Sequence, residues 1–345
     1  MRFSRTAAQL IAALLTISPV VAYDIQERML YPAEVETSVL RVISTADLDV
    51  FDPILLAFQA ENPGVSIDYI VTETADLMQA LYTDGASFDL AISSAMDLQT
   101  KLANDGFART YTSPVTEALP DWARWRNQIF AFTQEPAVVV VSDAFFAGEQ
   151  PPQSRDELIA LLRESPERFR GRIGTYDVRR SGFGYMMATQ DSRNSEAYWR
   201  LMEVMGWLDA QLYCCSGEMI RDVASGRLAL AYNVLGSYAQ SQLATTDGFR
   251  IVELDDYVNV MLRTVLIPQT AQNISDAQSM VDFLTNLAAR PDLVAASELP
   301  AIAPETFQAN TALRPIRFGP GLLVFLDQLK REAFLRNWED SLVQN

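Results

Sequence analysis

Short apolar stretches alternate with amphipathic ones over most of the chain, which predicts strands and helices in turn. Apolar residues fall at every second position of residues 65–71, as in a strand with one buried face. Because a helical stretch follows each strand before the next one, the order predicts a parallel sheet with right-handed crossovers. The first strands are predicted at 39–44, 65–71 and 88–93, and the first helices at 52–61, 75–84 and 96–104.

The middle of the chain repeats this alternation less regularly. Strands are predicted at 137–142, 173–176, 228–232, 249–254 and 261–267, with helices between them. We therefore expect an α/β fold with two lobes, in which the chain crosses out near residue 135 and returns near residue 256. The predicted parts are a leader (1–22), a polar lead (23–37), a first lobe (38–135 and 256–345, with the C-terminal helices) and a second lobe (136–255).

The first 22 residues have the layout of a secretory signal peptide. Arg2 and Arg5 form a basic start, an uncharged apolar run covers residues 7–21, and small residues end at Ala22. A membrane anchor is the alternative, but the apolar run is shorter than the ~20 residues that a spanning helix needs. We predict cleavage after Ala22 and a mature protein in the periplasm.

Composition excludes several functions. The chain has 27 Lys and Arg against 44 Asp and Glu, a formal net charge of −17, which does not suit nucleic acid or an anionic lipid surface as a partner. It contains no histidine, so Ser-His-Asp and Cys-His catalysis and His-type zinc sites are excluded. No phosphate-binding or dinucleotide-binding glycine motif occurs either. We predict a protein that is not an enzyme and that holds neither a cofactor nor a metal ion.

The two cysteines of the chain, Cys214 and Cys215, are adjacent in sequence. They cannot join distant segments. In an oxidising compartment they form either a vicinal disulfide or two small buried thiols, and the sequence leaves this choice open.

Small polar side chains follow five of the predicted strands. In an open α/β sheet, ligands bind beyond the carboxyl ends of the strands, where free N–H groups at helix starts hold anions. Arg179 and Arg180 add a positive charge that can grip a phosphate or carboxylate, although the sequence does not say which of them does so. Each hydroxyl or amide could instead be an ordinary helix N-cap. The full set of predicted ligand contacts is Ser44, Thr45, Thr72, Ser93, Ser94, Arg179, Arg180, Ser181, Gly182, Asn233, Ser237 and Tyr238.

Three stretches resemble a branch of the bacterial extracellular solute-binding proteins: residues 93–99, 232–239 and 313–323. This branch is often labelled ferric-ion-binding and also contains phosphoglycerate-transport regulatory and hexose-phosphate-binding members. The resemblance implies a two-lobed "Venus flytrap" of the type II periplasmic-binding-protein kind, with two crossover strands at the hinge. It also implies that ligand binds between the lobes and is delivered to an ABC permease in the inner membrane.

The sequence indicates the identity of the ligand less directly than it indicates the fold. Ferric-ion-binding members resemble one another in a vicinal tyrosine pair, whereas the nearest region here reads Tyr213-Cys214-Cys215. Tyr232 and Tyr238 could still supply phenolates. We predict that a small anionic metabolite, a sugar phosphate or a phosphoglycerate-like compound, binds to a monomeric protein. The alternatives are a ferric-ion-binding transport protein and a ligand-sensing partner of a two-component sensor kinase.

Overall fold

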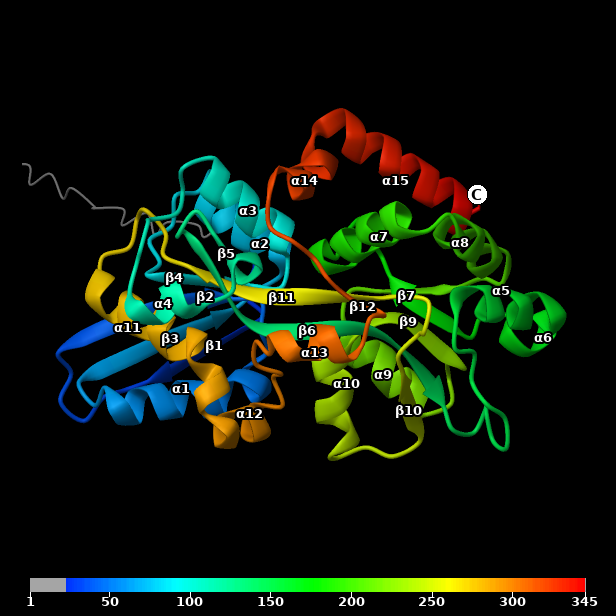
Figure 1. Cartoon of the computed structure of the whole chain (residues 1–345), viewed down its shortest axis with the longest axis horizontal. Helices are drawn as coiled ribbons and strands as arrows, with labels where there is room; N and C mark the ends of the chain where they lie inside the picture. The colour runs from blue at the N-terminus through cyan, green and yellow to red at the C-terminus, as the bar shows by residue number, and fades with distance from the viewer. Residues whose placement is uncertain (1–22, 345) are drawn as a thin grey trace, which may run out of the picture.

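The strands form a mixed sheet that continues through two lobes, which lie side by side along the long axis of the molecule (Figure 1). The computed structural model describes residues 23–344, so the predicted leader, residues 1–22, lies outside the described residues. Two long strands, β6 (Ile129–Ser142) and β11 (Val258–Leu266), run between the lobes. The first half of β6 pairs with β11, and its second half pairs with strands of the second lobe. β6 is therefore one of the crossover strands.

The first lobe contains a sheet whose strands follow the spatial order β1-β3-β2-β4-β11-β6. The predicted parallel arrangement is confirmed, because β2 pairs in parallel with both β3 and β4. Its strands are β1 (Glu27–Tyr31), β2 (Ser38–Ser44), β3 (Val65–Val71), β4 (Leu90–Ser93) and the short β5 (Arg124–Trp125) and β12 (Leu313–Pro315). Its helices are α1 (Leu48–Glu61), α2 (Thr74–Met78), α3 (Met96–Asn104), α4 (Pro114–Ala118), α11 (Ile274–Thr285), α12 (Pro291–Ser297), α13 (Pro304–Ala309) and α14 (Pro320–Leu323).

The second lobe continues the sheet through β9, β7 and β8, with β10 on β6. Its strands are β7 (Ile173–Tyr176), β8 (Gln211–Tyr213), β9 (Leu230–Leu235) and β10 (Phe249–Val252). Its helices are α5 (Arg155–Glu164), α6 (Pro166–Phe169), α7 (Gly182–Asn194), α8 (Ala197–Trp207), α9 (Ser216–Ala224) and α10 (Gly236–Leu243). The structure thus confirms the predicted α/β class with two lobes.

Several predicted boundaries were wrong, most of all the start of β6, which lies at Ile129 and not at residue 137. Two of the differences have clear local reasons. Helix α1 begins at Leu48 rather than at Asp52, since Asp47 takes the extended N-cap position. The side chain of Asp52 instead accepts a hydrogen bond from Tyr31 Oη at 2.6 Å. Strand β9 continues to Leu235, three residues beyond its predicted end, because the whole stretch is buried against both neighbouring layers.

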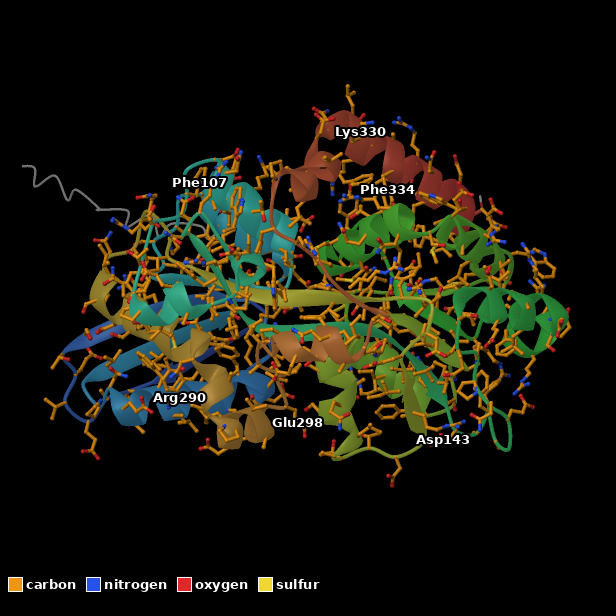
Figure 2. All side chains as sticks on the ribbon, in the orientation of Figure 1. Phe107, Asp143, Arg290, Glu298, Lys330 and Phe334 are labelled. Atoms are coloured by element: carbon orange, nitrogen blue, oxygen red, sulfur yellow. A yellow bond between two sulfur atoms is a disulfide. The ribbon has the colours of Figure 1, made fainter. Side chains whose placement is uncertain are left out.

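The C-terminal segment lies across both lobes. Helix α14 packs against α3, whereas α15 (Gln328–Leu342) packs against α8 of the second lobe. Figure 2 shows Phe334 on the face of α15 that is turned toward α7 and α8, and its ring lies 5.4 Å from that of Trp199. The lobe limits stay a prediction, with α15 found on the second-lobe side. Among residues 23–344, no helix is long and apolar enough to cross a membrane.

Candidate functional site

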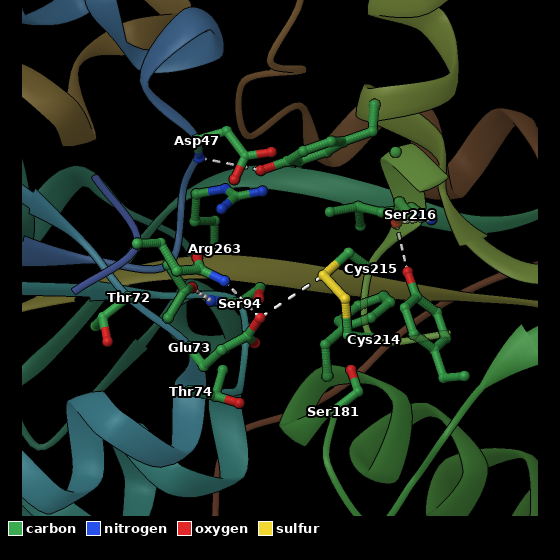
Figure 3. A pocket seen from close by; sticks show the side chains of 17 residues that line it. Asp47, Thr72, Glu73, Thr74, Ser94, Ser181, Cys214, Cys215, Ser216 and Arg263 are labelled. Atoms are coloured by element: carbon green, nitrogen blue, oxygen red, sulfur yellow. Dashed lines mark hydrogen bonds between the residues drawn. A yellow bond between two sulfur atoms is a disulfide. The ribbon is translucent and has the colours of Figure 1, made fainter. Parts of the chain in front are cut away.

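A cavity lies between the two lobes, where strands from both sides end (Figure 3). We call it the cleft cavity. Its volume of about 90 Å³ is enough for a small ligand group, since a single water needs only about 10–15 Å³. Its lining comes from the first lobe (Gln26, Thr45, Asp47, Thr72, Glu73, Thr74 and Ser94), the second lobe (Tyr176, Ser181, Phe183, Cys214, Cys215, Ser216, Gly217, Leu235 and Tyr238) and the strand β11 (Arg263).

Helix starts from both lobes surround the cleft cavity. The N-cap residues of α1, α7, α9 and α10 all line it: Asp47, Ser181, Cys215 and Leu235. The first N–H groups of a helix have no partner within the helix and carry a partial positive charge. Their convergence supplies the cavity with N–H donors that can hold an anion without a net positive charge on the protein.

Arg263 provides the guanidinium group of the cleft cavity. It is fully buried, and Glu135 on β6 accepts hydrogen bonds from its Nε at 2.8 Å and from its Nη2 at 3.0 Å. Burial alone would raise the pKa of Glu135, but the charge and hydrogen bonds of Arg263 outweigh it and hold that pKa below its ordinary value. Ser237 also donates a hydrogen bond to Glu135. The carboxylate thus fixes the guanidinium at the edge of the cavity and largely neutralises it.

Two carboxyl groups face the cleft cavity from the first lobe. Partial desolvation in the cleft raises the pKa of Asp47, and the charge of Asp49 raises it further. Burial likewise raises the pKa of Glu73, even though Gln26 Nε2 donates a hydrogen bond to it at 2.7 Å. Both groups can accept hydrogen bonds from ligand hydroxyl or amino groups.

The cysteines, which the sequence left undecided, are joined as a vicinal disulfide. Cys214 and Cys215 are partly buried and form part of the second-lobe wall of the cleft cavity (Figure 3). The Sγ atom of Cys215 lies 3.6 Å from Glu73 Oε1, across the boundary between the lobes. The disulfide therefore meets the first lobe directly.

The lobes touch at two further points beside the cavity. The backbone N–H of Asp47 donates to Tyr238 Oη at 3.2 Å, and the N–H of Gly182 donates to Thr74 Oγ1 at 3.1 Å. A Cβ atom at residue 182 would lie 2.3 Å from the Thr74 hydroxyl, so only glycine allows this approach. The described conformation is a closed one.

The structure brings five of the predicted contacts together. The cleft cavity is lined by Thr45, Thr72, Ser94, Ser181 and Tyr238, and Gly182 makes the adjacent contact with Thr74. The hydroxyl of Ser94 forms no hydrogen bond with any other group in residues 23–344 and is free to meet a ligand.

Ser44 and Ser93 lie behind the cavity wall. Both are fully buried, and each hydroxyl accepts a hydrogen bond from the backbone N–H two residues ahead, at 3.0 Å for Ser44 and 3.1 Å for Ser93. They stabilise the turns after β2 and β4. These are the ordinary structural roles that the sequence allowed as an alternative.

Asn233 and Ser237 point away from the cleft cavity. Since β9 continues past residue 232, Asn233 lies inside the strand, and its amide donates to Asp191 Oδ2 at 2.8 Å. Tyr232 belongs to the same buried group, which we call the Arg155 cluster: Arg155, Asp191, Tyr232, Asn233, Asp256 and Asn259. Ser237 holds Glu135 and so acts only through the neighbour of Arg263.

Arg179 and Arg180 line a separate outer groove beside the cleft cavity, together with Asp97, Lys101 and Arg331. Arg179 is held by Asp177 through Nε and Nη2, both at 2.8 Å. Thr74, Ser181 and Gly182 separate this groove from the cleft cavity. The guanidinium group inside the cleft cavity is that of Arg263, which the sequence prediction missed.

A metal site in the cleft cavity would depend on few residues. Within the described part of the chain, one group of three Cys, Asp and Glu ligand atoms lies close enough to share an ion, and it consists of Glu73, Cys214 and Cys215. Its two sulfur atoms are bonded to each other, so neither is the thiolate that binds metals. Tyr176 and Tyr238 also line the cavity, but burial raises the pKa of both phenols and so disfavours phenolate.

Comparison with known proteins points to one family. The sequence profile described as bacterial extracellular solute-binding protein matches residues 40–295. The substrate-binding protein of an ABC transporter from Agrobacterium tumefaciens is 32% identical, with a TM-score of 0.85 over 92% of this chain and 98% of that chain. A search among curated proteins found no significant match.

Two more distant structures share the fold. The periplasmic binding protein AfuA from Actinobacillus pleuropneumoniae, solved with fructose-6-phosphate bound, is 15% identical with a TM-score of 0.69, over 89% of this chain and 99% of that chain. Iron-bound HitA from Pseudomonas aeruginosa is 13% identical with a TM-score of 0.65, over 88% and 99%. At these identities the likeness concerns the fold alone.

Proposed function

Because the chain belongs to the bacterial extracellular solute-binding proteins and is the solute-binding component of an ABC transporter, we propose that it captures a small hydroxylated organic anion in the cleft cavity. The favoured class is a sugar phosphate or a phosphoglycerate-like compound. Proteins of this kind work with a permease in the inner membrane and are generally not enzymes. The family places the protein outside the cytoplasm, in the periplasm.

One observation carries the proposal: helix starts from both lobes converge on a hydroxyl-lined cavity that contains a single guanidinium. A phosphate or carboxylate would accept hydrogen bonds from the N–H groups at the start of α9, which no side chain caps, and from Arg263. Ligand hydroxyls would donate to Asp47 and Glu73 from the opposite side. A ligand that carries both kinds of group satisfies both walls, so binding and closure become one event.

We assign direct ligand contacts to Thr45, Thr72, Ser94, Ser181, Tyr238 and Arg263. Gly182 supports closure through its contact with Thr74. Ser44, Ser93 and Ser237 support the wall from behind, whereas Asn233 belongs to the Arg155 cluster inside the second lobe. Arg179 and Arg180 line the outer groove, and the charge of Arg180 acts on Glu73 of the cleft cavity.

A thermal-shift screen followed by calorimetry tests the proposal. The panel contains fructose 6-phosphate, glucose 6-phosphate, 3-phosphoglycerate, the same compounds without phosphate, and ferric citrate. We expect stabilisation by at least one phosphorylated compound and none by its dephosphorylated counterpart. Failure of every phosphorylated compound to stabilise the protein would contradict the proposal.

Ferric ion is the second candidate, favoured by the presence of Tyr176, Tyr238, Asp47 and Glu73 around one cavity. It requires ionised phenols, whose pKa values burial raises. Iron bound by phenolate absorbs visible light, so a coloured complex with ferric citrate would favour this candidate. Tight iron binding together with no response to phosphorylated compounds would replace the organophosphate proposal.

We further propose that export removes residues 1–22, that the mature protein is a monomer without catalytic activity, and that transport is its role. The mass of the exported protein tests the removal of residues 1–22, and size-exclusion chromatography tests whether the mature protein is a monomer. A sensor kinase encoded beside the protein, in place of permease and ATPase genes, would favour the signalling alternative.

A further inference from the structure

The lining of the cleft cavity contains a covalent cross-link, the vicinal disulfide. Cys214 and Cys215 are the only cysteines of the chain, and Cys215 is the N-cap residue of α9. A disulfide stabilises a fold chiefly by closing a loop in the unfolded chain. Since these residues are neighbours in sequence, their bond closes no such loop, so cross-linking does not explain it.

The position of the disulfide in the cavity wall indicates a role in ligand binding. Figure 3 shows it in the middle of the second-lobe wall, with Ser181 and Ser216 to either side and Glu73 opposite. Phe183 and Leu235 line the same side of the cavity. The second-lobe wall thus contains an apolar surface inside an otherwise polar cavity.

The bonded sulfur atoms carry no proton. The 3.6 Å approach of Cys215 Sγ to Glu73 and the 3.8 Å approach of Cys214 Sγ to Glu218 are therefore van der Waals contacts and not hydrogen bonds. A ligand made only of hydroxyl and phosphate groups would leave this surface unmatched. A sugar ring has an apolar C–H face and a rim of hydroxyl groups, which match the disulfide and Glu73 respectively.

We propose that the Cys214–Cys215 disulfide, with Phe183 and Leu235, forms a binding platform for the C–H face of a ring-shaped ligand. The preferred solute is then a cyclic sugar phosphate and not an open-chain phosphoglycerate. This inference rests on the function proposed above and names the ligand class within it.

Reduction removes the platform without changing the sequence. Tris(2-carboxyethyl)phosphine breaks the S–S bond, the two sulfurs each gain a proton as thiols, and the phosphine takes oxygen from water to become its oxide. The freed thiols can then separate. Cys215 also gains an S–H donor next to Glu73, which competes with ligand hydroxyls for that carboxyl group.

The test measures affinity by calorimetry with two ring probes, fructose 6-phosphate and glucose 6-phosphate, and one open-chain probe, 3-phosphoglycerate. The proteins are the oxidised wild type, the reduced wild type and the C214S/C215S variant. We expect the affinity for the better ring probe to fall about tenfold on reduction or substitution, as loss of one apolar contact surface implies. Affinity for 3-phosphoglycerate should change by less than about threefold.

Controls separate the platform from a structural role. Reductant should not affect the C214S/C215S variant, and the melting temperature of each unliganded form should stay close to that of the oxidised wild type. An equal loss for ring and open-chain probes, no loss for either, or unfolding of both altered forms would overturn the inference. A wild type that binds only 3-phosphoglycerate would overturn it while leaving the proposed function intact. A wild type that binds none of the three would refute the proposed function itself.

Discussion

Two buried arginines have similar partners but lie in different parts of the molecule. Arg155 is 2% exposed and is enclosed in the second lobe by Asp191, Tyr232 and Asp256. Arg263 is 1% exposed on the hinge strand, where Glu135 holds it from behind while its guanidinium borders the cleft cavity. Burial and ion pairing are thus nearly the same in the two places. Access to the cavity is what separates a structural charge from one that can meet a ligand.

This comparison also explains the misplaced site residues. Asn233 and the candidate phenol Tyr232 belong to the Arg155 cluster, although they stand next to the predicted end of a strand. Their polar groups satisfy one another inside the lobe, as buried polar groups must. Residues of the cleft cavity differ in that some of their groups, such as the Ser94 hydroxyl, have no partner among the described residues.

Removal of Asp191 should produce the largest effect. Asp191 is fully buried and accepts hydrogen bonds from Tyr232 and Asn233 at 2.8 Å and from Asn259 at 2.7 Å, besides pairing with Arg155. The Asp191→Ala variant leaves a guanidinium in the core without its most buried partner, so we expect a loss of about 3–5 kcal/mol in unfolding free energy. Urea unfolding measures it.

Asp256 provides the matched control for this change. It pairs with the same guanidinium at 2.9 Å, but its side chain is 30% exposed. The Asp256→Ala variant should therefore lose only about 1 kcal/mol, because water can replace the carboxylate. Ligand affinity of both folded variants should match the wild type. A large affinity loss with unchanged stability would show that the Arg155 cluster takes part in the site.

The Glu135→Gln variant tests Arg263, the second of the two buried arginines. It keeps the shape of the side chain but removes the charge that neutralises Arg263, so we expect stability to fall by about 3 kcal/mol at pH 7. Affinity for a phosphorylated ligand should rise severalfold, since the guanidinium then acts on the ligand alone. Calorimetry and urea unfolding on the same samples measure the two changes, and a fall in affinity would contradict the assignment.

Acid should reduce the stability difference between this variant and the wild type. The folded-state pKa of Glu135 lies below its ordinary value, so its ion pair stabilises the fold above the unfolded-state pKa. That contribution is lost as the pH falls through the folded-state pKa. The unfolding free energies of wild type and Glu135→Gln should therefore converge in acid, and curves that stay parallel would exclude the pairing as the cause.

Closure itself can be weakened at Gly182. The Gly182→Ala variant places a Cβ atom 2.3 Å from Thr74 Oγ1, which should hold the lobes apart and lower ligand affinity about tenfold. Stability of the unliganded protein should change little, because the clash is between the lobes. Adding Thr74→Gly removes both the hydroxyl and the Cβ atom of residue 74, which would lie 2.9 Å from the new Cβ, and should recover part of the affinity. No recovery would show that the substitution acts within α7 and not on closure.

The alternation of apolar residues was sufficient to predict the α/β fold, the parallel strands and the two lobes, because hydrophobic periodicity follows directly from burial. It could not predict which polar residues at the strand ends face the cavity. A shift of three residues in the end of β9 places Asn233 inside the lobe. Arg263 gave one usable signal, because it is the single charged residue of the strand Val258–Leu266. Asp47 and Cys215 gave no local signal, since they reach the cavity only when the lobes meet.

The adjacent serines at the end of β4, Ser93 and Ser94, give the smallest and most specific prediction. Ser93 Oγ accepts the N–H of Ala95 at 3.1 Å, whereas the Ser94 hydroxyl lines the cleft cavity without a partner among residues 23–344. Ser94→Ala should therefore lower ligand affinity about fivefold to tenfold, the cost of one hydrogen bond, and leave unliganded stability unchanged. Ser93→Ala should instead lower stability by about 1 kcal/mol with little effect on affinity. Calorimetry and thermal unfolding of both variants measure the contrast, and reversed effects would mean that the cavity wall is formed by Ser93. The two residues are of the same type and adjacent in sequence. Different effects of the two substitutions would therefore show that access to the cavity, and not residue type, decides the role of a polar group.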